Sequence, residues 1–185
     1  MTMSPDRLAT RLAADLDGAF PDLVRDLSPG LYSGALRMLG NRSDAEEVTQ
    51  EALIRAYRAL SEYPEHRIHE MRLKGWVWTI AANLCRNRLR SRARHHAVSL
   101  DTDDPADPTP GPEAALLSSE VGGELAAVLL QLPWEMRLAV VLKHVVGLSY
   151  AEISAALDRP PATVRSDVHR GLARLRVAYP QSEES

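Results

Sequence analysis

Apolar side chains recur along this chain at intervals of three and four residues, which is the period of an amphipathic helix. In one stretch the apolar positions are Ala45, Val48, Ala52, Ala56 and Leu60. A second helix is predicted from about residue 74 to residue 92, and a short one within the first eighteen residues, where leucines recur at every fourth position. No segment alternates in steps of two, so the pattern predicts an all-α fold without strands.

Polar residues indicate where the helix of the first stretch begins. Ser43 and Glu46 have the spacing of a capping box, in which the serine hydroxyl accepts a hydrogen bond from the third amide and the glutamate bonds back to the cap amide. We therefore expect this helix to start at Ser43. Glu47, Gln50 and Glu51 then lie together on a face away from the apolar stripe.

The C-terminal part of the chain has the pattern of a helix-turn-helix. Ser149 and Glu152 form a second capping box that opens a short amphipathic helix, and the prolines at positions 160 and 161 end it. The apolar positions of the next helix are Val164, Val168, Leu172 and Leu175. Arginines lie off this stripe, which is typical of a recognition helix, because arginine contacts phosphates by charge and guanine edges bidentately. The pattern alone also fits a helical hairpin with a solvated basic face.

The sign of the charge changes along the chain. The net charge is −3, but residues 86–96 contain five arginines and no acid, and residues 159–176 contain five arginines and one acid, Asp167. Residues 97–119 contain no Lys or Arg and four prolines, a composition typical of a flexible linker. We therefore expect two small helical domains, 19–96 and 118–178, joined by an acidic linker, 97–117, with an N-terminal extension, 1–18, and a tail, 179–185.

Composition argues against several classes of protein. The longest apolar runs fall far short of the roughly 20 residues that span a bilayer, and no apolar secretory segment opens the chain, so we expect a cytoplasmic protein. A single cysteine, Cys85, allows no intrachain disulfide and no thiolate cluster. We expect no catalysis, no metal and no cofactor, because the possible metal ligands lack a matched further ligand. These possible ligands are His66, His69 and Glu70, or His95 and His96.

Two groups of motifs carry a resemblance that covers most of the chain. Residues 35–94 resemble conserved region 2 of the sigma-70 family, with the motifs DAEEVTQE (44–51) and GWVWTIAAN (75–83) followed by the arginine-rich tail. Residues 132–166 resemble region 4, with the motifs LPWEMR (132–137), GLSYAEI (147–153) and ATVRS (162–166). Because a linker stands where larger members carry another domain, the chain resembles the extracytoplasmic-function (ECF) group. The resemblance implies a sigma factor that directs RNA polymerase to promoters and opens the DNA; the alternative is a helix-turn-helix regulator that acts without polymerase.

The resemblance also implies which residues contact each partner. Region 2 would dock on the clamp helices of the largest polymerase subunit through Asp44, Glu47, Gln50 and Glu51, and region 4 would lie at the flap region. The −10 element would be opened and read by Tyr63, Trp78, Asn83, Arg86, Arg88 and Arg90, together with loop residues 66–74. Ordinary packing is an equal alternative for the two aromatic residues. The −35 element of the promoter DNA would meet Thr163, Arg165, Ser166, His169, Arg170 and Arg174.

Family resemblance further implies an anti-sigma factor that masks both domains until a signal arrives. Within region 4, two positions depart from the family pattern: Ala162 stands where many relatives have glycine, and Asp167 where a basic residue is common. These departures leave the expected fold unchanged and bear on the preference for the −35 sequence. An acid in the first turn of a helix also favours the positive end of the helix dipole.

Overall fold

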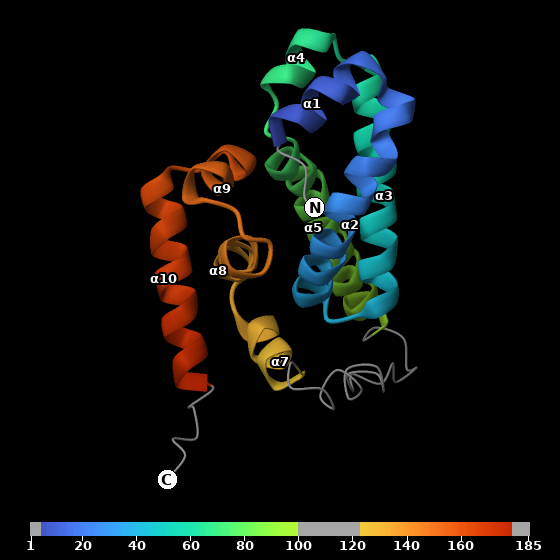
Figure 1. The fold of residues 1–185 in the computed structure, drawn as a ribbon. Coiled ribbons are helices and arrows are strands. Elements are labelled where there is room, and N and C mark those ends of the chain that lie inside the picture. Colours follow the sequence, from blue (N-terminus) through green and yellow to red (C-terminus); the bar gives the residue numbers. More distant parts are fainter. Residues whose placement is uncertain (1–4, 100–122, 179–185) are drawn as a thin grey trace.

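The computed structural model describes residues 5–99 and 123–178, and within these ranges every regular element is helical, as predicted. The N-terminal half contains α1 (Pro5–Ala14), α2 (Leu16–Leu39), α3 (Arg42–Glu62), α4 (Glu65–Glu70) and α5 (Leu73–Ser99). The C-terminal half contains α7 (Gly123–Gln131), α8 (Trp134–Val140), the π-helical turn η1 (Val141–Val145), α9 (Tyr150–Leu157) and α10 (Pro161–Ala178). Figure 1 shows the two halves side by side. Most of the predicted linker (100–117) and the predicted tail (179–185) lie outside the described residues.

A bundle of α2, α3 and α5 forms the frame of the N-terminal half. The predicted apolar stripe of α3 is confirmed, since all five of its members are buried. Gly40 ends α2 with φ at 68°, a left-handed conformation that glycine adopts without a steric penalty. A Cβ at this position would also lie 2.5 Å from Leu130 Cδ1, so α7 packs closely against the turn between α2 and α3.

The predicted start of α3 is one detail that the structure corrects. Asn41 is the N-cap, and its side chain accepts a hydrogen bond from the Asp44 amide at 2.9 Å. Ser43 is therefore already inside the helix and does not act as the cap. The reason is local: Asn41 follows Gly40 in extended conformation (φ −139°, ψ 129°), which is the backbone geometry an N-cap requires.

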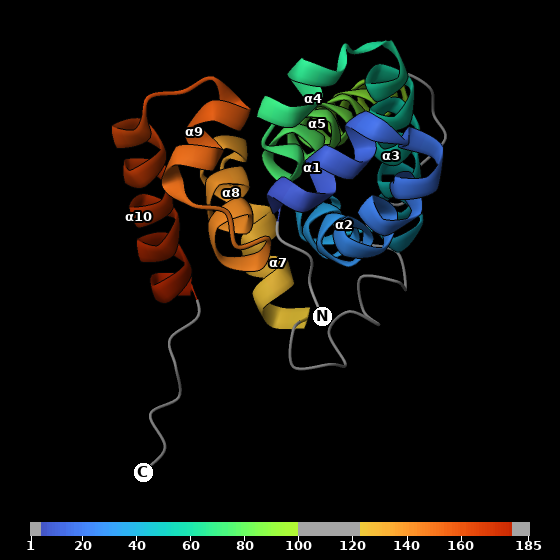
Figure 2. The same cartoon turned by 45° about the horizontal axis from the view of Figure 1, so that its top comes forward.

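The helix α1 is an integral part of the N-terminal half. The leucines at positions 8 and 12 are buried in α1, and they belong to a second apolar cluster that also contains Leu60, Ile68 and Leu73. Leu16 is the first residue of α2, so the predicted boundary between residues 18 and 19 falls within that helix. Figure 2 shows α1 lying close to α4 at one end of the bundle, next to the start of α5.

The predicted helix-turn-helix is confirmed as a structural element by α9 and α10. Ser149 and Glu152 form the capping box in both directions, and Asp158 ends α9 with φ at 50°. The stripe of α10 faces inward, with Val164, Val168 and Leu175 buried. None of the helices in the described residues is long and apolar enough to cross a membrane.

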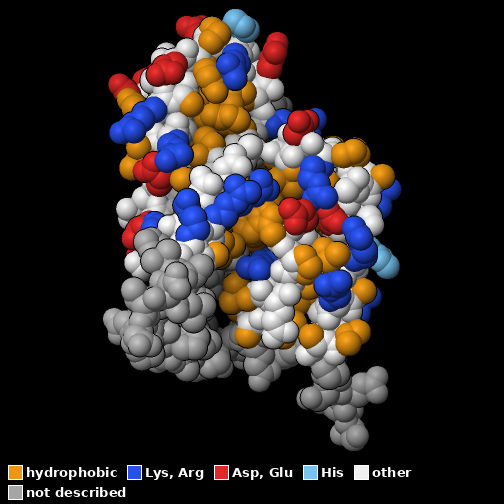
Figure 3. All heavy atoms as spheres, turned by 180° about the vertical axis from the view of Figure 1, so that it is seen from behind, with side chains coloured by type: hydrophobic (Ala, Val, Ile, Leu, Met, Phe, Trp, Pro, Cys, Tyr) orange, Lys and Arg blue, Asp and Glu red, His pale blue; other side chains and the backbone are white. Residues whose placement is uncertain are grey.

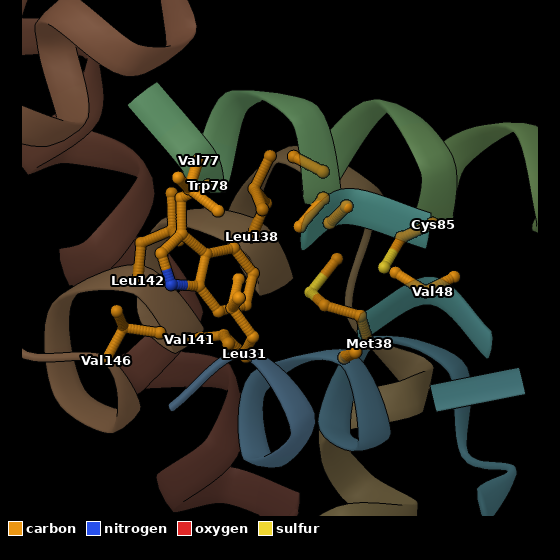
Figure 4. Close-up of a cluster of buried hydrophobic side chains, with 14 of the residues drawn as sticks. Leu31, Met38, Val48, Val77, Trp78, Cys85, Leu138, Val141, Leu142 and Val146 are labelled. Atoms are coloured by element: carbon orange, nitrogen blue, oxygen red, sulfur yellow. The ribbon is translucent and has the colours of Figure 1, made fainter. Parts of the chain in front are cut away.

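The two halves share one continuous apolar core, a contact that the sequence pattern did not predict. Trp78 of α5, with 2% of its surface exposed, lies among Leu31, Leu138 and Leu142 in Figure 4. Gly34 makes this close approach possible, because a Cβ there would lie 2.3 Å from Trp78 Cη2. The predicted two helical domains are therefore present, but they pack directly against each other.

Polar contacts between the halves mostly end on backbone carbonyls. The Arg137 guanidinium donates across the boundary to Met38 O at 2.8 Å. Within its own half it also donates to Leu130 O at 2.8 Å and Leu132 O at 3.1 Å, so it satisfies carbonyls at the C-terminal ends of both α2 and α7. Lys74 Nζ donates to Val146 O at 2.6 Å, and Thr79 Oγ1 to Ala156 O at 2.9 Å. Partial burial lowers the pKa of Arg137, as expected for a cation removed from water.

The corrected N-cap can be tested by two alanine substitutions. We expect Asn41→Ala to lower the free energy of unfolding by about 1 kcal/mol, because the Asp44 amide loses its acceptor. Ser43→Ala should change it by less than about 0.5 kcal/mol, the usual range for an exposed position. Urea denaturation followed by circular dichroism measures both values. The reverse order of the two effects would show that Ser43 is the cap.

Candidate nucleic-acid interface

The outer face of α10 is a basic surface in the C-terminal half. Arg165, Ser166, His169, Arg170 and Arg174 are all exposed there, and Thr163 is half-buried. Figures 1 and 2 place α10 at the edge of the molecule, away from the N-terminal half. The residues predicted to meet the −35 element therefore do share one accessible face, apart from Thr163 at its margin.

Asp167, which departs from the family pattern, is buried beneath this face. Its side chain is 4% exposed, and its two oxygens pair with Arg159 and Arg170, both at 2.7 Å. The Asp167 carboxylate therefore does not face a DNA ligand. By pairing with Arg159, it links the turn that precedes α10 to α10 itself. Because both arginines keep part of their surface in water, the pair is not fully desolvated.

Tyr150 lies beside the basic face, at the start of α9. Its ring is 5.3 Å from the Arg165 guanidinium carbon and 4.8 Å from Lys143 Nζ. Cation–π attraction of this kind restricts the positions of both cations. Arg165 is therefore partly oriented before any ligand is bound.

A second set of basic residues lies along α5 itself. Asn83 and Arg90 are exposed, while Arg86 and Arg88 are half-buried. Arg88 forms ion pairs with Glu47 and, at 3.5 Å, with Asp44. A residue that was predicted to bind DNA is therefore paired with two residues that were predicted to bind polymerase. Arg92 also pairs with Asp44, whose side chain is only 14% exposed. Asp44 and Arg88 therefore join α3 to α5.

The two aromatic residues predicted as stacking groups differ in the structure. Tyr63 is half-buried, with the Arg67 guanidinium 3.6 Å from its ring centre and the Trp76 ring at 6.0 Å. Trp78 is not accessible to a base here, because its indole fills the core between the two halves. Ordinary packing, the alternative left open from the sequence, is correct for Trp78 in this conformation.

An open hollow lies where α5 meets the start of α8. Its volume is about 370 Å³, and its lining residues are Arg86, Leu89, Arg90, Ala93, Trp134 and Glu135. The Arg86 guanidinium is 5.5 Å from the centre of the Trp134 ring. On the face seen in Figure 3, Lys and Arg side chains border hydrophobic surface near the middle of the molecule. Two of the residues predicted for the −10 element therefore stand at the boundary between the halves.

The outer face of α3 carries the remaining predicted residues and two that the sequence reasoning missed. Glu47 and Gln50 are exposed, and Glu51 is half-exposed in an ion pair with Arg55 at 2.6 Å. Ile54 is 46% and Tyr57 is 37% exposed on the same side of the helix. The signal for Ile54 was present in the sequence, because this isoleucine falls outside the buried stripe of its helix.

Metal and thiol chemistry have little support in this part of the chain. Within residues 5–99 and 123–178, no group of three or more His, Cys, Asp or Glu side chains could hold a metal ion. Burial raises the pKa of the Cys85 thiol to about 12, so this cysteine is a poor nucleophile. The side chains of His95 and His96 lie outside the described residues.

Comparison with known proteins covers both halves. The Sigma-70 region 2 family matches residues 23–95, and the Sigma-70, region 4 family matches residues 122–175. The ECF RNA polymerase sigma factor SigW of Bacillus subtilis is 33% identical over 168 residues, covering 85% of this chain and 87% of that protein. SigE of Mycolicibacterium smegmatis, another ECF RNA polymerase sigma factor, is 39% identical over 160 residues, and these cover 85% of this chain but 60% of the relative.

Two solved structures have a similar fold. CnrH, in complex with the cytosolic domain of CnrY, is similar with a TM-score of 0.69 and 22% identity over 97% of this chain and 99% of that chain. The sigma factor RpoE of Bartonella quintana, in complex with the anti-sigma factor NepR, has a TM-score of 0.66 and 23% identity over 87% of this chain and 94% of that chain. Both family regions occur in this chain, and SigW is similar along most of its length. The chain therefore belongs to the sigma-70 family, within its extracytoplasmic-function group of RNA polymerase sigma factors.

Proposed function

We propose that this chain directs promoter recognition, DNA opening and transcription initiation by the RNA polymerase core in the cytoplasm, and that it catalyses nothing itself. The observation that carries the proposal is the presence of both sigma regions in one chain, each with an exposed basic face. A regulator that needs only the helix-turn-helix would have no use for region 2. The similarity to SigW over both regions also favours a sigma factor over such a regulator.

Region 4 reads the −35 element through the outer face of α10. Arg165 and Arg174 are exposed and contact phosphates or guanine edges, and Ser166 and His169 add hydrogen-bonding groups on the same face. Arg170 has a weaker role than the sequence suggested, because its guanidinium already pairs with Asp167.

Region 2 opens and reads the −10 element with α5 and the segment from residue 63 to residue 74. Asn83, Arg86 and Arg90 are the polar groups of α5 that stay accessible or partly accessible. A base that leaves its stack must be held by the protein at a cost of a few kcal/mol, which hydrogen bonds and stacking offset. Arg88 acts mainly by bracing α5 against α3.

The outer face of α3 docks on the polymerase clamp helices. Glu47, Gln50 and Glu51 supply polar groups for an arginine-rich surface, and Ile54 supplies apolar area on the same side of the helix. Asp44 serves this contact indirectly, because it is mostly buried against Arg88 and Arg92.

The packed arrangement of the two halves is an inactive conformation. By their designations, the −35 and −10 elements are about 25 base pairs apart, or roughly 85 Å at about 3.4 Å per base pair. A compact chain of 185 residues has a radius of gyration of only about 16 Å. The halves must separate before one chain contacts both elements, and core polymerase stabilises the separated form. An anti-sigma factor would stabilise the packed form; RpoE of Bartonella quintana, which has a similar fold, is in complex with the anti-sigma factor NepR.

The proposed activity is tested directly with purified core polymerase. Adding this protein should yield promoter-dependent transcripts from promoters selected from its own genome. Ile54→Asp should weaken binding to core by more than about tenfold, because a charge enters an apolar contact. Asp26→Ala, at an exposed position of α2, serves as the control and should leave both readouts unchanged. Zero transcripts together with tight specific DNA binding by the free protein would favour the regulator without polymerase.

The need for opening is tested by locking the two halves together. A Cβ built on Gly75 lies 3.9 Å from Ala156 Cβ, close to the spacing of about 3.8 Å found in disulfides. The double variant Gly75→Cys with Ala156→Cys should lose promoter-dependent transcription when oxidised and regain it in dithiothreitol. Each single variant is a control, and buried Cys85 should not interfere. Equal activity of the oxidised and reduced double variant would rule out the requirement for separation.

A further inference from the structure

The short helix α4 depends on its neighbours for its position. It has only six residues, and its N-cap, Pro64, provides no side-chain hydrogen bond. Isolated helices of this length are not stable in water, because few backbone hydrogen bonds offset the cost of nucleation. Ile68, 3% exposed, is the buried residue of α4, so the packing around Ile68 largely determines where α4 lies.

That packing is supplied largely by α1. Leu8, Ala9 and Leu12 are 6%, 2% and 1% exposed, and they share an apolar cluster with Ile68. This cluster is separate from the core that joins the two halves of the molecule. Figures 1 and 2 both show α1 lying close beneath α4.

The other end of the contact is anchored to the bundle. Arg11 of α1 forms an ion pair with Asp22 of α2 at 2.6 Å, and Asp22 also pairs with Arg25 at 2.7 Å. Leu60 and Leu73, which flank α4 in the sequence, also belong to this apolar cluster. The helix α1 is thus a fixed support between α2 and α4.

The polar side chains of α4 point away from this support. His66, Arg67, His69 and Glu70 are exposed, and Arg67 also lies over the Tyr63 ring at 3.6 Å. These residues belong to the segment that, under the proposed function, holds bases of the −10 element. Their positions relative to α5 are therefore set by the apolar contact on the opposite side of α4.

We propose that α1 is a positioning element for −10 recognition: by burying Ile68, Leu8 and Leu12 hold α4 in the place where residues 63–72 receive an unstacked base. The inference rests on the proposed function and assigns a role to the N-terminal helix. A recognition segment supported by packed side chains is ordered before the ligand arrives, so binding does not bear the cost of ordering it. Leu8 and Leu12 are positioning residues and do not touch DNA.

The test uses the double variant Leu8→Ala with Leu12→Ala in the full chain. We expect faster hydrogen exchange of backbone amides in residues 63–72, unchanged binding to core polymerase, and a loss of discrimination between the promoter and its −10 base substitutions. The loss should be about tenfold, the scale of one base contact. The conservative variant Leu8→Met with Leu12→Met keeps the apolar volume and should restore discrimination.

Two controls separate positioning from general loss of stability. Leu39→Ala removes a buried leucine from the other core and should destabilise the protein without changing exchange in residues 63–72 or −10 discrimination. Ile68→Ala disrupts the same contact from the α4 side, so its effect should not add to that of the α1 variant.

The outcomes distinguish this inference from the proposed function. Unchanged exchange in residues 63–72 overturns the structural role of α1, whatever the transcription result. Faster exchange with unchanged −10 discrimination overturns the role in recognition. If the unaltered protein yields no promoter-dependent transcripts, the proposed function and the recognition role both fail, while the exchange measurement still decides whether α1 fixes α4.

Discussion

The apolar contact between α5 and the helical turn after α8 is the interaction on which the arrangement of this molecule depends. The Trp78 indole packs against Gly34 next to Val141, and the main core continues through this contact from region 2 into region 4. Burial of apolar surface is the main favourable term here, at about 25 cal/mol per Å² removed from water. Under the proposed function, separating the halves would expose this surface, so the open form would need another partner to cover it or to offset its cost.

The polar part of this boundary suits a contact that forms and breaks. Arg137, Lys74 and Thr79 donate mostly to backbone carbonyls, which water can satisfy when the halves separate. The described interface has no ion pair that spans the two halves, so separation leaves no buried charge without a partner. The basic residues on the outer face of α10 are exposed in the packed form, whereas Arg86 lies against Trp134 at the boundary. Closure therefore affects the −10 surface more than the −35 surface.

Side chains with a functional assignment in the sequence often serve the fold. Asp44 and Arg88 connect α3 and α5. Asp167 connects α10 to Arg159 in the turn between α9 and α10. Such residues support the exposed groups that are proposed to contact a ligand. Their charges still matter, because each pair fixes the helix that presents a neighbouring side chain, such as Arg90 on α5 or Arg174 on α10.

The sequence by itself determined the helical class, the capping box at Ser149 and the basic face of α10, because these follow from local spacing and side-chain chemistry. The order of the two sigma regions came from the resemblance of their motifs to a known family. It did not reveal α2, whose pattern is interrupted by Pro21 and Pro29, and it misplaced the cap of α3. Only the tertiary structure decided that Trp78 is buried, that Asp167 is paired, and that α1 supports α4. The burial of Trp78 and the contact of α1 with α4 depend on which residues distant in the chain meet in space, and periodicity along one helix carries no information about its partner. The partners of Asp167 are near it in the chain, but only the folded turn before α10 brings Arg159 to its carboxylate.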